Sequence, residues 1–400
     1  GQIAIMHRVL VDERKWIEEE RFLHALNFCV LLPGPEATKL ATYIGWLLHG
    51  TRGGLAAGIL FVLPGALVML GLSILYAMGR GIPAVDGALF GIKAAVLVIV
   101  VEALIRIGKR ALKTRALFGM AAAAFIGIFF FAIPFPVIVI AAALTGFFIT
   151  RAPVGSAAAP VPGAWPRAVK AIVIGLLLWW MPVLAVVLVL GSAHVLAAVG
   201  LFFSKLAIVS FGGAYALLAY MAQQAVETHH WMSAPEMVDG LGLAETTPGP
   251  LILVTQFVGF LAGYRDPAPF APLGAGVAAA ALTTWVTFVP PIMLIFAGAP
   301  FVEQLRSNER LSGALAGITA AVVGVILNLT VWFALHVLFG QVRELHAGLV
   351  RWYGFDPFAL DLTVAALALL AAVLAFGFKR GLVELVIVMA TLGVALRLFS

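Results

Sequence analysis

Long apolar runs without Asp, Glu, Lys or Arg alternate with short polar segments along most of the chain. A transmembrane α-helix needs about 20 such residues. Runs of that length include Gly54 to Met78, Ala116 to Thr150, Ala171 to Ser204, Leu273 to Val302 and Leu311 to Leu335. The second and third are long enough for two crossings each. Because lipid cannot satisfy backbone polar groups and the runs lack the alternation of barrel strands, we predict an all-α, polytopic helical membrane protein.

An internal repeat divides the chain into two homologous halves. Pro33-Gly34-Pro35 returns as Pro248-Gly249-Pro250, 215 residues further on. The same shift superimposes four more pairs: Met6 on Met221, Val11 on Val226, Trp16 on Trp231 and Leu26 on Leu241. Further along, the ten residues 87–96 match 313–322 at eight positions, with the shift grown to 226. Two halves that break an apolar stretch at the same place are typical of secondary transporters.

The repeat also predicts the domain organisation. Residues 1–150 form the first repeat, 151–192 a Pro-, Gly- and Ala-rich linker (151–167) followed by one span, and 193–400 the second repeat. Under the 215-residue shift Gly1 corresponds to Ala216, so the counterpart of 205–214 would lie before Gly1. We therefore expect the first repeat to lack its opening helix in this sequence.

The distribution of charged residues indicates how the two halves are oriented in the membrane and gives no sign of a nucleic-acid partner. Hydrophobic residues make up 63% of the chain and charged residues 11%. The net charge of +6 comes from short loops and not from a continuous basic face, so nucleic acid is not an expected partner. Residues 1–21 carry Arg8, Arg14, Lys15 and Arg21, whereas the equivalent 216–236 holds no Lys or Arg. The basic loop 106–115 corresponds to 336–357, which holds Arg343 and Arg351. If positive loops face the cytoplasm, the halves are inverted repeats.

The two Pro-Gly-Pro breaks are the main candidates for a binding site. Proline removes a backbone donor and glycine permits left-handed geometry, so each break ends one helix and starts another. Free N–H groups at the new helix N-terminus suit an oxyanion, and a buried lysine would add charge. The predicted substrate-binding residues are Pro33, Gly34, Pro35, Lys39, Thr42, Tyr43, Lys93, Phe211, Gly212, Gly213, Pro248, Gly249, Pro250 and Gln256.

Each of these features has an ordinary structural alternative. A single break could be a tight turn at the membrane surface, although its recurrence in both halves favours a cavity at membrane depth. Lys39 and Lys93 could extend to the interface, since Val254 and Thr319 replace them in the other half. The polar residues after the breaks could bond neighbouring helices, and Phe211-Gly212-Gly213 could serve close helix packing.

The sequence contains no convincing catalytic constellation, phosphate loop or metal-ligand spacing, so we expect neither an enzyme nor a cofactor or metal site. His229-His230 falls in a polar stretch without a counterpart in the other half, which favours a solvated loop. The single cysteine, Cys29, excludes an intramolecular disulfide. The alternatives that remain are a transporter or channel for sulfate or another anion and, from another class, an interfacial membrane enzyme.

Several motifs together resemble a known family. They are Gln2 to Arg8, Trp16-Ile17, Phe22 to Leu26, Leu32 to Gly45 and Gly53-Gly54 in the first half, and Ser210 to Gly213, Trp231-Met232 and Gly242 to Pro250 in the second. These segments resemble the long-chain chromate ion transporters, and the resemblance covers essentially the whole chain. One departure is Ala214, which stands where that family usually has a proline.

The resemblance implies a multi-pass protein of the bacterial inner membrane that exports chromate and confers chromate resistance. Sulfate, of similar shape and charge, is the expected competitor; the lipid bilayer is the other partner, and a homo-oligomer is allowed. The expected mechanism is alternating access at a mid-membrane site between the two Pro-Gly-Pro breaks. Lys39 or Lys93 would there compensate the charge of the anion.

Overall fold

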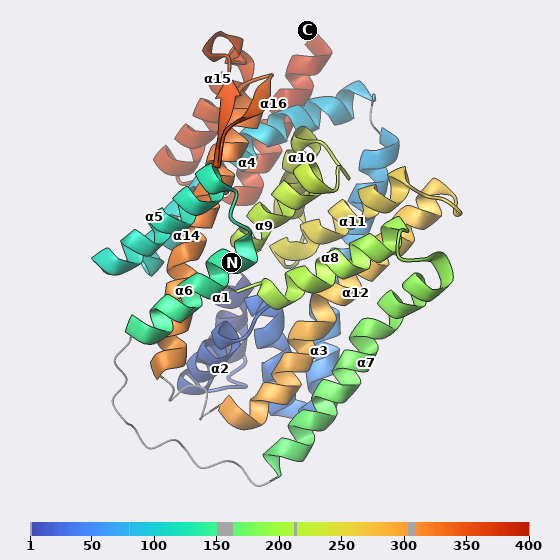
Figure 1. The fold of residues 1–400 in the computed structure, drawn as a ribbon, viewed down its shortest axis with the longest axis vertical. Helices are drawn as coiled ribbons and strands as arrows, with labels where there is room; N and C mark the ends of the chain where they lie inside the picture. Colours follow the sequence, from blue (N-terminus) through green and yellow to red (C-terminus); the bar gives the residue numbers. More distant parts are fainter. Residues whose placement is uncertain (1, 80, 150–162, 212–213, 303–308, 400) are drawn as a thin grey trace. The chain divides into compact units, whose positions relative to one another are not determined.

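The computed structural model describes residues 2–79, 81–149, 163–211, 214–302 and 309–399, and these are almost entirely helical (Figure 1). The first half contains α1 (Gln2–His7), the π-turn η1 (Arg8–Glu13), α2 (Glu19–Leu31), α3 (Glu36–Gly79), α4 (Pro83–Ala111), α5 (Arg115–Phe131) and α6 (Phe135–Ile149). Next along the chain come α7 (Ala164–Leu190) and α8 (Val195–Val209). α7 thus begins inside the segment predicted as a linker, of which 151–162 lie outside the described residues.

The second half follows a similar order, with separate helices in place of the kinked α3 and with two added strands. It contains α9 (Ala214–Gln223), η2 (Gln224–Thr228), α10 (Ala234–Thr246), η3 (Leu251–Leu253), α11 (Val254–Arg265), α12 (Pro272–Gly298), η4 (Ala299–Phe301) and α14 (Glu309–Leu338). The strands β1 (Val342–Ala347) and β2 (Val350–Phe355) follow, then η5 (Pro357–Ala359), α15 (Leu362–Ala372), η6 (Val373–Gly377) and α16 (Leu382–Phe399).

Six helices of the described chain are long and apolar enough to cross a membrane: α3, α4, α7, α12 with η4, α14 and α16. α7 shows the lipid-facing character most clearly, because apolar side chains such as Leu188 (83% exposed) project from it. The predicted run 116–150 is two helices, α5 and α6, separated at Ala132, which has a left-handed φ of 51°. The run 171–204 is likewise divided between α7 and α8. These findings confirm the all-α polytopic class.

The duplication extends to the hydrogen bonding of single turns. α2 and α10 are offset by the 215-residue shift at both ends. Before them, Lys15 and His230 share a positive φ of 52° and 51°. The N–H of Trp16 donates to the Leu10 carbonyl at 2.8 Å, and that of Trp231 to the Ala225 carbonyl at 2.9 Å. The two halves therefore share backbone conformation at positions where their sequences differ.

Close glycine contacts also recur in pairs. A Cβ on Gly393 of α16 would overlap the carbonyl of Gly87 in α4, and a Cβ on Gly146 of α6 would overlap the carbonyl of Gly313 in α14. Gly87 and Gly313 are repeat equivalents in the sequence. Thus α4 of the first half packs on the last helix of the second half, and α14 of the second half packs on the last helix of the first. Small residues permit such approach of helix backbones in a membrane.

Contacts divide the chain into two compact units, and each unit takes segments from both halves. Unit 1 comprises 1–68, 143–217 and 248–317, and unit 2 comprises 69–142, 218–247 and 318–400. In unit 1, α12 packs against α7, α8 and α11. In unit 2, α4 is the central helix and packs against α10, α15 and α16.

A short β-hairpin, which the sequence analysis did not predict, occupies most of the loop 336–357. β1 and β2 pair in antiparallel register from Val342 opposite Phe355 to Ala347 opposite Val350. Gly348, with a φ of 61°, supplies the left-handed conformation that a tight hairpin turn requires. Tyr353 on β2 has a buried side chain, whereas the side chains of β1 are largely exposed.

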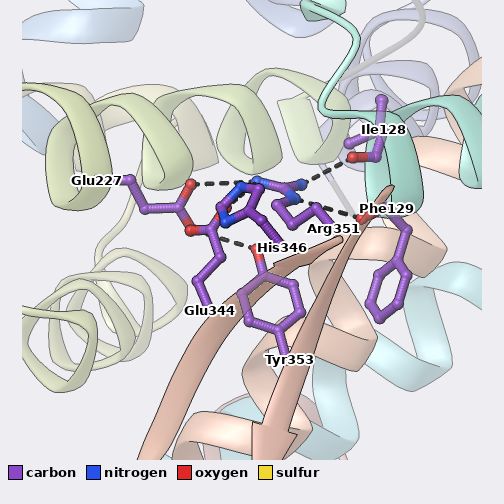
Figure 2. Close-up of polar contacts among 7 residues, drawn as sticks. All are labelled: Ile128, Phe129, Glu227, Glu344, His346, Arg351 and Tyr353. Atoms are coloured by element: carbon purple, nitrogen blue, oxygen red, sulfur yellow. Dashed lines mark hydrogen bonds and ion pairs between the residues drawn. The ribbon is translucent and has the colours of Figure 1, made fainter. Parts of the chain in front are cut away.

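Arg351 fastens this hairpin to the rest of unit 2 (Figure 2). Its side chain is 3% exposed, and it donates to the carbonyls of Ile128 at 2.7 Å and Phe129 at 3.3 Å, at the end of α5. The carboxylates of Glu227 and Glu344 lie 3.6 and 3.4 Å from its Nη1. The charge argument for orientation treats Arg351 as a loop charge, but its side chain is buried and paired with carboxylates. Of the two arginines in this loop, Arg343 is the exposed one.

Two carboxylates share this one guanidinium, which affects their protonation. Burial raises the pKa of Glu227 above its ordinary value of 4.5; the Glu344 carboxylate raises it further and Arg351 opposes the rise. Burial also raises the pKa of Tyr353, whose hydroxyl donates to Glu227 at 3.2 Å. His346 lies 3.3 Å from Glu344. The charges of Arg351, Glu227 and Glu344 balance when Glu227 is protonated.

The glycine contact of α4 with α16 should be essential for the stability of unit 2. A Cβ on Gly91 would overlap the Met389 carbonyl. Gly91→Ala should therefore destabilise the protein by about 1–3 kcal/mol, the usual cost of overpacking. Thermal unfolding in detergent would measure this, with Gly71→Ala as the matched control, because a Cβ there would meet no atom of the described residues within 4 Å. Equal melting temperatures for both variants would contradict the packing argument.

Removing the Arg351 charge should release the hairpin. Arg351→Gln leaves the Glu227 and Glu344 carboxylates, which are 22% and 32% exposed, without their cation and removes the donor to the carbonyls of Ile128 and Phe129. Such a loss typically costs about 1–3 kcal/mol. Hydrogen exchange should then show lost protection in β1, β2 and the end of α5, whereas Arg343→Gln, an exposed neighbour, should change nothing.

The pH dependence of the same exchange tests the protonation of Glu227. A raised pKa in the folded state means that protonated Glu227 stabilises docking below 4.5, and that this contribution is lost as the pH rises through the folded pKa. Protection of the hairpin should fall over that range in the unaltered protein. It should stay constant in Glu227→Gln; the same pH profile in both would show that Glu227 is not the titrating group.

Candidate functional site

The first Pro-Gly-Pro break lies between α2 and α3 and packs against two other elements of unit 1. Gly34 has a φ of +106°, which favours glycine. Its N–H donates to the carbonyl of Ser210, just after α8, at 2.9 Å. A Cβ at Gly34 would lie 2.5 Å from the Cβ of Pro291 in α12. The break therefore lies beside the Ser210-Phe211 end of α8, as well as against a spanning helix.

The second break lies between α10 and η3 and makes the equivalent contact. Gly249 has a φ of +130°. A Cβ on Gly65 of α3 would overlap the carbonyl oxygen of Pro248 and would lie 3.3 Å from the Cα of Gly249. The break and α3 can approach closely because each has a glycine at the contact, Gly249 and Gly65.

The helix positions that receive the two breaks correspond to each other in the repeat. Phe61-Val62-Leu63-Pro64 in α3 matches Phe288-Val289-Pro290-Pro291 in α12, 227 residues apart. Each break therefore packs beside the proline of the other half's spanning helix. Gly65 is halfway along the part of α3 that follows the non-helical residues His49 and Gly50. The second break consequently contacts α3 at the middle of a membrane-spanning length of helix.

The two breaks lie in one region of unit 1, where α3 meets α12. A Cβ on Gly58 of α3 would lie 3.4 Å from Cδ1 of Ile292, the residue after Pro291. Gly58 precedes Gly65 by seven residues, or about 10 Å along a helix. The contacts of both breaks are thus within about two turns of this meeting point.

A buried cation accompanies the first break. Lys39 is 1% exposed, and its ammonium donates to the carbonyl of Leu32, the residue that follows α2. The side chain thus reaches back across Pro-Gly-Pro from the first turns of α3. In the second half Val254, which is completely buried, replaces it. The positive charge therefore belongs to one break only.

Four buried side-chain oxygens on α3, α11 and α12 have no hydrogen-bond partner among the described residues: Thr38 Oγ1, Gln256 Oε1, Thr283 Oγ1 and Thr287 Oγ1. Thr283, Thr287 and Pro291 follow one another at four-residue spacing, so they share one face of α12, the face that meets the first break. An unsatisfied buried polar atom costs about 1–3 kcal/mol. These oxygens are suited to contact water or a polar ligand.

Lys93 lies in unit 2, at the wall of a cavity. Its Nζ is 3.5 Å from Oδ1 of Asp239 in α10, and the Asp239 side chain is fully buried. The cavity, of about 610 Å³, is lined by Gly81, Pro83, Asp86, Leu89, Phe90, Lys93 and Arg397. The structure thus groups Lys93 with an acid that the sequence analysis did not single out.

Comparison with known proteins agrees with this architecture. The chromate transporter family matches residues 1–147 and 197–396. The chain belongs to the chromate transporter family.

Two relatives named as chromate transport proteins, and one uncharacterized transporter, match most of the chain. A chromate transport protein of Pseudomonas aeruginosa is 34% identical over 339 residues, which are 82% of this chain and 74% of the relative. One of Cupriavidus metallidurans is 26% identical, over 84% of this chain and 78% of the relative. An uncharacterized transporter, MJ0718 of Methanocaldococcus jannaschii, is 25% identical over 84% and 80%. No solved structure matches the chain.

The remaining residues that the sequence predicts to bind substrate make hydrogen bonds and ring contacts within the protein. Thr42 is buried and donates to the Thr38 carbonyl at 2.8 Å, and the Tyr43 ring packs against Phe28 and Trp46. Gln256 donates from Nε2 to the carbonyl of Ala66, next to Gly65, at 2.9 Å. Gly212 and Gly213 lie outside the described residues.

Sequence reasoning missed four polar residues that the structure adds to these sites: Thr38, Thr283, Thr287 and Asp239. The three threonines had a weak signal, as hydroxyls inside apolar segments. Asp239 had a stronger one, because it is an acid close to an apolar helix end with His24 at the equivalent position of the other half.

Proposed function

We propose that this protein exports chromate from the cytoplasm across the inner membrane of a bacterium. Membership in the chromate transporter family and six apolar helices of spanning length support transport of chromate through a bilayer. The observation that carries the proposal is the pair of glycine-centred breaks, each packed at the proline of the other half's spanning helix. Sulfate, which has the same charge and tetrahedral shape, is the proposed competitor.

The substrate site in this proposal lies between the breaks where α3 meets α12. Backbone N–H groups that begin the helices after Pro35 and Pro250 would donate to the oxyanion, as helix N-termini do in other anion sites. The ammonium of Lys39 would compensate part of its charge. The hydroxyls of Thr38, Thr283 and Thr287 supply donors that are already buried and unpaired among the described residues.

Alternating access would then arise from the duplication. We propose inverted halves, because four basic residues in 1–21 have no basic counterpart in 216–236. Inverted repeats allow one site to be exposed to either side of the membrane by exchanging the conformations of two similar halves. The recurring glycine contacts and turn geometry provide the two similar scaffolds that such an exchange requires.

The membrane potential makes export the favourable direction. An inside-negative potential of 100 mV favours the exit of a dianion by about 4.6 kcal/mol, at about 2.3 kcal/mol per charge. A dianion therefore needs no further driving force to leave the cell.

Inverted membrane vesicles test the function directly. Vesicles that contain the protein should accumulate labelled chromate when an inside-positive potential is imposed, since the cytoplasmic face is then outside. Excess sulfate should reduce the accumulation. Absence of potential-driven accumulation, with folded protein present in the membrane, would contradict chromate export.

Substitutions at the breaks test the site. Gly34→Ala and Gly249→Ala should each reduce chromate accumulation at least tenfold, about 1.4 kcal/mol, because a Cβ is strained at both φ angles and at Gly34 meets Pro291. Gly71→Ala is the control.

Thr287→Val is a milder test, because it keeps the side-chain shape and removes an unpaired hydroxyl. We expect at least a threefold loss of accumulation, less than the usual worth of a hydrogen bond, about 1 kcal/mol. Thr284→Val on the same helix, whose hydroxyl bonds the Ala280 carbonyl at 2.9 Å, should have little effect. Equal accumulation by all these variants, at equal membrane levels, would place the substrate elsewhere.

A further inference from the structure

The lining of the cavity in unit 2 carries an excess of positive charge. Its walls come from α4 and its preceding turn and from the end of α16. Two cations, Lys93 and Arg397, and one acid, Asp86, line it. The Arg397 guanidinium lies 5.6 Å above the ring of Phe90, and Asp86 accepts a hydrogen bond from the N–H of Gly81 at 3.1 Å. The volume of about 610 Å³ is ample for a tetrahedral oxyanion with its first waters.

Behind this cavity, Lys93 is held by a buried acid. Asp239 Oδ1 lies 3.5 Å from Lys93 Nζ, and Asp239 Oδ2 accepts from the Tyr76 hydroxyl at 2.8 Å. The Asp239 side chain is fully buried, whereas that of Lys93 is 23% exposed. The ammonium therefore stands between an internal carboxylate on one side and the open cavity on the other.

A close helix contact positions the acid. A Cβ on Gly242 of α10 would overlap the side chain of Ile92, the residue before Lys93. Asp239 and Gly242 are three residues apart and share one face of α10, so the glycine brings the acid within reach of α4. In the repeat, His24 and Thr319 occupy the positions equivalent to Asp239 and Lys93. The ion pair therefore joins the two halves, and the equivalent positions hold no such pair.

We propose that this cavity binds a divalent oxyanion, and that the oxyanion and the Asp239 carboxylate compete for the Lys93 ammonium. The inference deepens the proposed chromate export by adding an oxyanion site in unit 2. Without the anion, Asp239 neutralises Lys93; with it, Lys93 and Arg397 face the bound dianion. Protonation of Asp239 frees Lys93 and so favours binding.

In this proposal Asp239 is the group whose protonation changes anion binding. The groups around it have other roles. Tyr76 of α3 donates to it, Lys93 of α4 pairs with it, and Arg397 of α16 and Asp86 of α4 line the cavity beyond Lys93. The other acids on α10 and α16 include Glu236, which caps its own helix at Ser233, and Glu384, which pairs with Arg380 at 3.0 Å. For the proton of Asp239, the dissociation constant can rise by at most about tenfold per pH unit.

Equilibrium binding to the purified full chain in lipid nanodiscs tests this. Labelled chromate is used at alkaline pH, where it is a dianion, and labelled sulfate, which stays a dianion as the pH falls, is used for the pH profile. Lys93→Gln and Arg397→Gln should each weaken binding about tenfold or more, as the loss of a charged partner does. Lys109→Gln, an exposed cation on the same helix, should not. Asp239→Asn should tighten binding several-fold and reduce its pH dependence.

The double variant decides whether the two groups compete. In the Lys93→Gln background, Asp239→Asn should bring no further tightening, because the ammonium for which both anions compete is gone. Tightening by the same factor with and without Lys93, or weakening by Asp239→Asn alone, would overturn the proposal.

A second variant guards against misfolding of Asp239→Asn. Tyr76→Phe keeps the ring and removes the hydrogen bond to the carboxylate, so it should move the pH profile of binding to higher pH. An unmoved profile would also overturn the proposal. Because binding is measured without transport, failure here with normal vesicle accumulation would leave chromate export intact, and the converse result would reject export alone.

Discussion

The constraint behind this architecture is that backbone polar groups inside a membrane need partners within the protein. Each Pro-Gly-Pro segment interrupts a helix and releases such groups. At the first break the Gly34 N–H is satisfied by Ser210 and the Leu32 carbonyl by Lys39. Close cover is possible because glycine stands at Gly34 and at Gly65, where a Cβ would collide with the facing chain. The breaks are therefore stable only where other helices enclose them.

Each half of the chain covers the Pro-Gly-Pro break of the other half. The first-half break packs on Pro291 and the second-half break packs beside Pro64, which occupy equivalent positions in the repeat. The contacts Gly87 with Gly393 and Gly313 with Gly146 follow the same exchange. Neither half covers its own break at these positions, so the halves depend on one another for a folded membrane core. The contact units accordingly mix segments of both halves.

On this shared scaffold the charges are unequal. Lys39 accompanies one break only, the Lys93–Asp239 pair has Thr319 and His24 as its counterparts, and Arg351 fastens a hairpin in the second half. The two halves have similar backbones but different charged side chains. The same conformational change therefore has different electrostatic consequences in each half. Buried charge is costly in a membrane protein, so such pairs are retained where they serve function or specificity.

The sequence alone determined the helical membrane class, the duplication, the family and the position of both breaks, because spanning length, repeated motifs and Pro-Gly-Pro chemistry are local properties of the chain. It also marked Gly34, Gly249 and Lys39. Only the tertiary structure decided which helix each break packs against, that Thr287 shares a face with Pro291, that Lys93 meets Asp239 and that Arg351 is buried. These depend on pairs of residues far apart in sequence, and no local pattern encodes which of many apolar helices will lie beside a given glycine.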